Sequence, residues 1–242
     1  GGASGYSVSV SKNDDEKKYV VQRSSYSLDE LEPGDYVIKI KAVGNGRNVI
    51  DSAWSEPVYF KSTNTTGLVY RLTANGTAYE ISKVGRAAGE VVIDDEYRGK
   101  PVISIGEAAF RNSTKVTKLT VGNNVTSIGA NAFYNCASLE EIVLPDSLST
   151  INESVFQSCS KLKSVKLPEK IENIPESAFA YCESLETIIF PKNLKTIGEN
   201  AFLSCVALKT VTLPDETESV GKSAFSGCSA VEEVTFGKKL ET

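Results

Sequence analysis

Five cysteines are the reactive side chains with the most regular spacing in this 242-residue chain. They are Cys136, Cys159, Cys182, Cys205 and Cys228, each 23 residues after the one before. Thiols serve as nucleophiles or metal ligands, but both uses need partners. The chain has no histidine, which removes Ser-His-Asp and Cys-His arrangements, and no C-x-x-C pair that would indicate a zinc site. The spacing instead indicates that the cysteines occupy equivalent places in a repeating structure.

Equivalent cysteines of stacked coils would lie about 4.8 Å apart, the usual spacing of neighbouring strands. This distance is within the Cα range of a disulfide, but side chains in such a ladder point the same way and fit the disulfide dihedral poorly. We therefore expect a ladder of buried free thiols, because unpaired cysteine packs as a small apolar residue. One or two disulfides between neighbouring coils are the alternative.

Two acidic clusters are the other candidates for chemistry, Asp14-Asp15-Glu16 and Asp94-Asp95-Glu96. Carboxylate oxygens bind Ca²⁺, but neither cluster has the spaced ligands of a dedicated calcium loop. We expect solvated turns at both places, with no metal and no cofactor. Glycoside hydrolysis would need two carboxylates facing each other across a cleft. The repeat units all have the same length, so none contains an insertion that could form the wall of such a cleft. The sequence therefore predicts a protein that is not an enzyme.

Composition excludes further classes of function. The formal net charge of −5 and the pI near 5.1 argue against nucleic-acid binding, which requires a basic surface. No apolar run approaches the roughly 18 residues of a membrane span. The chain begins Gly1-Gly2-Ala3-Ser4-Gly5 and contains no methionine, so we expect the natural protein to extend beyond this start.

The cysteines belong to a longer repeat that fills residues 104–242. Its phenylalanines are also 23 residues apart, each with Ile or Val five residues earlier. Four units contain the pattern Leu-x-x-Ile/Val-x-Leu/Phe-Pro, which begins at Leu139, Leu162, Leu185 and Leu208. A fixed period of about 20 to 29 residues with this pattern indicates a leucine-rich-repeat solenoid. We expect a mainly β fold with right-handed coils. The phenylalanines are Phe110, Phe133, Phe156, Phe179, Phe202 and Phe225.

The segment before the regular repeats has a looser pattern. Residues 63–67 are rich in Ser, Thr and Asn and are typical of a linker. Residues 68–103 are expected to form degenerate, capping repeats, and Asn75-Gly76 predicts a hairpin turn within them. At the other end, Leu240 begins a unit that is not completed, so we expect that this end is truncated too.

Residues 1–62 lack the 23-residue repeat and contain runs of alternating apolar and polar residues, which are typical of strands. Leu31-Glu-Pro33-Gly34-Asp-Tyr36 and the alternating residues after it resemble the E to F corner of fibronectin type III domains, with Tyr36 as the tyrosine corner. The stretch from Ser52 to Phe60 resembles the last strand of that family. A full sandwich has about seven strands, whereas about four are indicated here. We expect a small β-sandwich-like domain that is incomplete.

The repeat unit itself, L-x-x-I-x-L-P-x-x-L-x-x-I-G-x-x-A-F-x-x-C, resembles the BspA-like class of leucine-rich repeats. The entry phrase from Gly99 to Gly106 resembles the usual start of that class, although Asn152 and Pro175 replace the glycine after Ile and Thr217 replaces an apolar residue. The resemblance implies a bacterial, secreted or cell-surface protein that adheres to host matrix proteins or to other cells. A passive spacer that displays another domain is the alternative.

The residues between the inward-pointing positions of each repeat strand should form an outward row, because side chains alternate along a strand. Exposed Val and Ile in this row are less expected than Thr, which indicates a surface for a protein partner or a glycan. A solvated face of β-branched residues is the other interpretation. We expect a monomer that binds its partner with Thr120, Glu141, Val143, Lys166, Thr187, Ile189, Thr210, Thr212 and Thr235.

Overall fold

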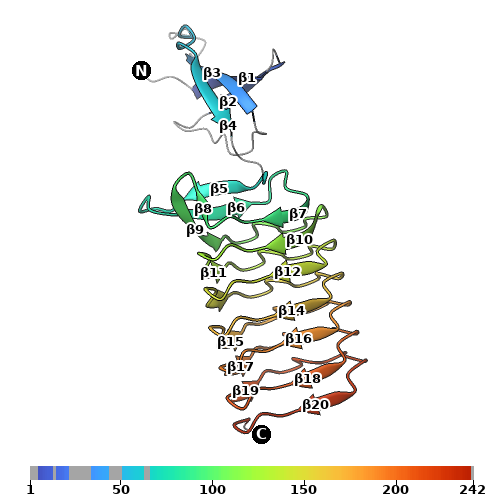
Figure 1. Ribbon diagram of the computed structural model, residues 1–242. Helices are drawn as coiled ribbons and strands as arrows, with labels where there is room; N and C mark the ends of the chain where they lie inside the picture. The colour runs from blue at the N-terminus through green and yellow to red at the C-terminus, as the bar shows by residue number, and fades with distance from the viewer. Residues whose placement is uncertain (1–4, 13–14, 22–33, 44–50, 63–65, 241–242) are drawn as a thin grey trace. The chain divides into compact units, whose positions relative to one another are not determined.

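A computed structural model describes residues 5–12, 15–21, 34–43, 51–62 and 66–240. The regular structure of these residues is all β-strand (Figure 1). The chain divides into two compact units, Gly1–Gly67 and Leu68–Thr242. The mainly β fold is thus confirmed, while the finer boundaries at residues 62/63 and 103/104 stay a prediction.

The first unit contains one four-stranded antiparallel sheet in the order β2-β1-β3-β4. Its strands are β1 (Gly5–Lys12), β2 (Asp15–Val21), β3 (Gly34–Val43) and β4 (Val58–Ser62). The expectation of a turn at Asp15-Glu16 is wrong, because β2 already begins at Asp15 and pairs there with β1. Asn13, Asp14 and the stretch from Leu31 to Pro33 lie outside the described residues. The fibronectin-like sandwich stays a prediction.

The second unit is a solenoid with 23-residue coils, as the repeat predicts (Figure 1). Each regular coil places a three-residue strand on one side and a two-residue strand on the other. Parallel pairing joins most equivalent strands of successive coils, for example Ile142 beside Leu119 and Ile188 beside Val165, and it is interrupted once on each side.

On the first side lie β7 (Gly89–Val92), β10 (Val116–Thr120), β12 (Glu141–Val143), β14 (Ser164–Lys166), β16 (Thr187–Ile189), β18 (Thr210–Thr212) and β20 (Glu233–Thr235). On the second side lie β5 (Val69–Leu72), β6 (Tyr79–Lys83), β9 (Lys100–Ile105), β11 (Ser127–Ile128), β13 (Thr150–Ile151), β15 (Asn173–Ile174), β17 (Thr196–Ile197) and β19 (Ser219–Val220). Strand β8 (Glu96–Tyr97) pairs with β9 in antiparallel fashion.

The hairpin predicted at Asn75-Gly76 is present, since β5 and β6 are antiparallel and the connection between them contains these two residues. The backbone N–H of Thr73 donates to the carbonyl of Ala78 over 2.9 Å and closes the connection. Strand β6 then pairs in parallel with β9, and β7 pairs in parallel with β10. Residues 69–92 therefore supply strands to both sides of the same stack as the regular repeats.

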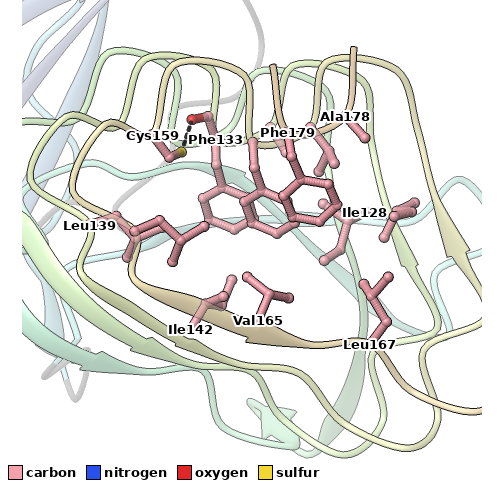
Figure 2. Packing of buried hydrophobic residues seen from close by; sticks show 14 of the residues in the cluster. Ile128, Phe133, Leu139, Ile142, Cys159, Val165, Leu167, Ala178 and Phe179 are labelled. Carbon is pink, nitrogen blue, oxygen red and sulfur yellow. Dashed lines mark hydrogen bonds between the residues drawn. The ribbon is translucent and has the colours of Figure 1, made fainter. Parts of the chain in front are cut away.

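The core is a column of phenylalanine rings (Figure 2). Phe133, Phe156, Phe179 and Phe202 follow one another with ring centroids 5.2 Å apart and nearly parallel planes. This separation is close to the strand spacing of about 4.8 Å, because each coil contributes one phenylalanine and neighbouring coils are one strand spacing apart. The inward Leu, Ile and Val of the two ladders surround the column and are also buried.

The turn around each phenylalanine uses left-handed backbone at two non-glycine positions in most coils. In the coil of Phe179 these are Ser177 and Tyr181, with φ of 55° and 60°. The N–H of Ser177 and the N–H of Tyr181 both donate to carbonyls of the next coil, over 3.0 and 2.7 Å. The turn therefore forms a third set of hydrogen bonds between coils, and Asn or Ser at most of these positions tolerates the left-handed conformation.

Two of the departures from the repeat pattern form bonds of their own. The glycine position after Ile is tight, since a Cβ on Gly129 would lie 2.5 Å from the N of Glu107 in the preceding coil. Asn152 occupies the same position one coil later, and its Nδ2 donates to the carbonyl of Ile128 over 2.8 Å. Thr217 is fully buried and its hydroxyl donates to the carbonyl of Leu194 over 3.3 Å. These substitutions thus replace apolar or backbone contact with hydrogen bonds.

Candidate binding face

The outward residues of the first-side strands form one continuous surface, which we call the strand face. Strands β12, β14, β16 and β18 each show the order exposed, buried, exposed. Side chains alternate along a strand, so the two exposed residues of each strand point away from the phenylalanine column. The inward and outward assignment made from the sequence is confirmed for these strands.

Strand pairing arranges the strand face in two columns. The first contains Glu90, Lys118, Glu141 and Ser164 in register, and the second contains Val92, Thr120 and Val143. Toward the other end, Lys166 lies beside Ile189 and Thr212 lies beside Thr235. The structure thus brings all nine candidate residues onto one side of the solenoid. That they bind a partner stays a proposal.

Three aliphatic side chains are exposed in the second column. Val92 is 53% exposed, Val143 is 44% exposed and Ile189 is 51% exposed. Val92 is missing from the sequence prediction, because its coil lacks the phenylalanine and cysteine that identify a regular repeat. The available signal was the run Glu90-Val91-Val92-Ile93, in which the buried Val91 and Ile93 place Val92 on the opposite side.

The strand face is concave next to the C-terminal ends of its first strands. A hollow of about 430 Å³ lies over β7, β10 and β12, and Val92, Thr120, Val143, Asp94, Asp95 and Asp146 are among the residues that line it. A second hollow of about 350 Å³ lies over β12 and β14 and shares Val143 and Asp146 with the first. Together they form a shallow groove that runs across the strands.

Hydrogen bonds between coils hold the charged side chains of this region. The N–H of Asn123 donates to the carboxylate of Asp95, and the Asn124 amide donates to the Asp95 carbonyl over 3.0 Å. The Lys118 ammonium lies 3.0 Å from the Glu141 carboxylate. The hydrogen bond to Glu141 raises the pKa of Lys118, with the negative charges of Glu141 and Glu90 acting in the same direction.

The acidic cluster at residues 94–96 is exposed, but the expected turn does not include Glu96, which begins strand β8. Asp95 joins two coils through its bonds with Asn123 and Asn124. Within the described part of the chain, no three His, Cys, Asp or Glu side chains are arranged to hold a metal ion. Glu16 of the other cluster accepts a hydrogen bond from the Ser9 hydroxyl and pairs with Lys18, and both lower its pKa. Asp95 and Glu16 thus have structural partners.

The cysteines form the ladder of free thiols that the spacing predicts. Four of them are buried and Cys228 is half-buried. Burial raises the pKa of Cys159 well above its ordinary value and raises the pKa of Cys182 to about 12. A thiol with so high a pKa is protonated near neutral pH, and the thiolate is the nucleophile. The buried thiols therefore serve packing rather than chemistry.

The BspA type leucine rich repeat region matches residues 98–209 and 150–242, with six copies of the repeat. These residues make up more than half of the chain, so the chain belongs to the BspA-type leucine-rich-repeat family. No curated protein matches the chain.

Several solved structures are similar to this one. A T. pallidum leucine-rich-repeat protein, TpLRR, has 29% identity and a TM-score of 0.66, over 69% of this chain and 78% of its own. A leucine-rich-repeat protein from Bacteroides ovatus has 30% identity and a TM-score of 0.56, over 72% of this chain and 52% of its own. A leucine-rich cell surface protein from Faecalibacterium prausnitzii has 26% identity and a TM-score of 0.54, over 74% of this chain and 55% of its own. The chain thus spans about half the length of the last two.

The described residues contain no helix that is long and apolar enough to cross a membrane.

Proposed function

We propose that this chain is a non-enzymatic protein-binding module of a bacterial surface or secreted protein, and that the strand face contacts the partner. The observation that carries the proposal is the exposure of Val92, Val143 and Ile189, which alternate with Thr120 and Lys166 in one column of that face. Clustered apolar side chains on the surface of a soluble protein mark interaction sites, whereas single ones are normal.

The architecture supports the same function. Solenoids present extended surfaces along which partners bind, because each coil adds the same small patch to a continuous face. The F. prausnitzii relative is described as a cell surface protein. We therefore propose that this chain lies outside the cell and acts as an adhesin, with host matrix proteins or surface proteins of other cells as partners and glycans as a second class of ligand.

A passive spacer is the second candidate, and a different observation favours it. Ion pairs join successive coils away from the aliphatic column, as between Glu140 and Lys163 over 2.9 Å and between Glu172 and Lys195 over 2.6 Å. Such pairs contribute little stability individually, but opposite charges at equivalent places favour the correct stacking of coils. A stalk would need this regularity and no binding surface.

The experiment that separates the two candidates is biosensor binding of the chain to a panel of immobilised matrix proteins, cell-surface extracts and glycans. The test variant is Val143→Asp/Ile189→Asp, which places two charges in the aliphatic column. The matched control is Tyr181→Asp/Val206→Asp, because these two residues are exposed to a similar extent, 42% and 43%, but lie in turns outside the strand face.

Binding that the test variant loses and the control variant keeps would support the strand face as the adhesive surface. Binding that both variants keep would contradict that placement. A chain that binds nothing on the panel would favour the spacer. Both variants alter exposed residues, so circular dichroism and thermal melting should first establish that each is folded.

A further inference from the structure

The strand face has an uneven charge along its length. In each coil we count the formal charges at four positions. Two are the outward residues of the strand, and two are the residues that follow the next inward residue. For β12 these positions are Glu141, Val143, Pro145 and Asp146. Over β7, β10 and β12 these positions hold five carboxylates and one ammonium, a net formal charge of −4. Over β14, β16, β18 and β20 they hold three of each and the net charge is zero.

The residues of the acidic half are Glu90, Asp94, Asp95, Glu141 and Asp146 with Lys118. Those of the neutral half are Glu169, Asp215 and Glu233 with Lys166, Lys192 and Lys238.

Two carboxylates of the acidic half have neither a hydrogen-bond donor nor a cation as partner among the described residues. Lys118 pairs with Glu141 and interacts with the charge of Glu90, and Asp95 accepts from the N–H of Asn123. Asp94 and Asp146 are exposed at the edge of the 430 Å³ hollow, and neither is paired with a cation among the described residues. The residues that line the hollow include no lysine or arginine. Its floor is aliphatic at Val92 and Val143, so the hollow combines an apolar surface with uncompensated negative charge.

We propose that this hollow binds a basic, aliphatic segment of a protein partner in an extended conformation, with Lys or Arg side chains on Asp94 and Asp146 and an aliphatic residue on Val92 and Val143. The inference rests on the proposed function and specifies the chemistry of the partner. Asp94 and Asp146 lie two coils apart, about 10 Å at the usual strand spacing. Side chains alternate between the two faces of an extended segment, so residues i, i+2 and i+4 face the hollow together, and residues i and i+4 lie about 13 Å apart. The flexible side chains of Lys or Arg at i and i+4 can reach Asp94 and Asp146 from these positions. A segment of the form cation, x, aliphatic, x, cation therefore matches the hollow.

Charge complementarity also decides against other occupants. A nucleic acid or an acidic glycan would bring negative charge onto Asp94 and Asp146 and be repelled. A purely apolar segment would leave two carboxylates desolvated without a partner, which costs free energy. A cationic segment satisfies both and gains speed of association from the local field.

The test is a titration of the ¹⁵N-labelled chain with the peptide Ac-Ala-Lys-Thr-Val-Thr-Lys-Ala-NH₂, followed by amide chemical shifts. The comparison peptide has both lysines replaced by glutamate. The test variant is Asp94→Asn/Asp146→Asn. The control variant is Glu153→Gln/Glu176→Gln, which removes the same charge from two exposed residues in the turns that precede Phe156 and Phe179.

We expect shifts at Val92, Thr120 and Val143 with the lysine peptide and none with the glutamate peptide. The test variant should raise the Kd about three- to tenfold, as loss of two exposed ion pairs predicts, and the control variant should leave it unchanged. Raising the salt concentration from 50 to 500 mM should weaken binding, because exposed ion pairs are screened.

Equal binding of both peptides, or a Kd that the test variant leaves unchanged, would overturn the inference. Shifts confined to residues outside the strand face would overturn it as well. These outcomes are separate from the failure of the proposed function, which is judged by the Val143→Asp/Ile189→Asp variant on the panel of macromolecules. If the Val143→Asp/Ile189→Asp substitutions abolish panel binding but the unsubstituted chain does not bind the lysine peptide, the proposed function holds and this inference fails, because the partner then has a different chemistry.

Discussion

The thiol of Cys182 donates a hydrogen bond to the carbonyl oxygen of Phe156, 3.1 Å away in the preceding coil. The same bond recurs in other coils, for example from Cys159 to Phe133, where Figure 2 shows it beside the stacked rings. The carbonyl of Phe156 also accepts from the N–H of Cys159 in its own coil, over 3.1 Å. The cysteine therefore links coils as a donor without being the carbonyl's sole partner.

Replacing Cys182 by alanine should cost about 1 kcal/mol of unfolding free energy. The substitution removes one hydrogen bond and a small buried volume, but the carbonyl of Phe156 keeps its backbone donor. Cys182→Ser should lower the unfolding free energy less than a polar substitution at another core position would, because serine retains a hydrogen-bond donor. Serine also fits this position, since Ser113 occupies the equivalent place in the first coil and is buried there. Urea denaturation of the three proteins measures the differences, and a loss of several kcal/mol for the alanine variant would contradict this account.

Alkaline pH should destabilise the solenoid through its buried thiols. The pKa of Cys182 is about 12 in the folded protein, whereas an unfolded thiol has a pKa of about 8.5. A raised folded-state pKa means that the stabilisation is complete below the unfolded value and is lost as pH rises toward the folded value. Between about pH 9 and 12 this thiol should lower the unfolding free energy by up to about 1.4 kcal/mol per pH unit.

Cys182→Ser provides the control for this titration, since its hydroxyl does not ionise in that range. Urea denaturation of both proteins from pH 8 to 11 should show their stability difference shrinking as pH rises. A difference that stays constant across the range would show that the thiol does not contribute to the alkaline loss.

Phe179→Ala should be more damaging than Phe225→Ala. The ring of Phe179 is fully buried and stacks on Phe156 and on Phe202, both at 5.2 Å. Phe225 is only half-buried and, among the described residues, stacks on Phe202 alone. We expect a cost of about 3 to 5 kcal/mol for Phe179→Ala and a smaller cost for Phe225→Ala. Equal costs in urea melts would contradict additive stabilisation by neighbouring coils.

Ala108→Gly should stabilise the protein. Ala108 has a φ of 53°, in the left-handed region where a Cβ is unfavourable and glycine is not. Relief of this strain should exceed the entropy that glycine adds to the unfolded chain, for a net gain of about 0.5 kcal/mol. The neighbouring Ala109 is buried and has no positive φ, so Ala109→Gly should destabilise. Thermal melting that moves in the same direction for both variants would refute the argument.

Much of the solenoid could be predicted from spacing. Residues recurring every 23 positions must occupy equivalent places, so Phe133 and Phe156 had to stack and Cys159 had to lie over Cys136. The alternation around Ile142 and Ile188 is enough to assign the outward residues of β12 and β16. Spacing did not reveal Val92, because its coil departs from the pattern that identifies the others.

The amino-acid sequence by itself determined the fold of residues 104–240, the alignment of the cysteines and the outward column with Val143 and Ile189, because a strict period converts sequence position into stacking position. That these cysteines are free thiols, and not disulfides between neighbouring coils, is seen in the structure. Only the tertiary structure decided which charges on the strand face remain uncompensated. Asp95 is bonded to Asn123 and Glu141 to Lys118, while neither Asp94 nor Asp146, which line the hollow, has such a partner in the part of the chain that the structure describes. These contacts join residues of different coils, and their pairing depends on side-chain reach and register that the period alone does not specify.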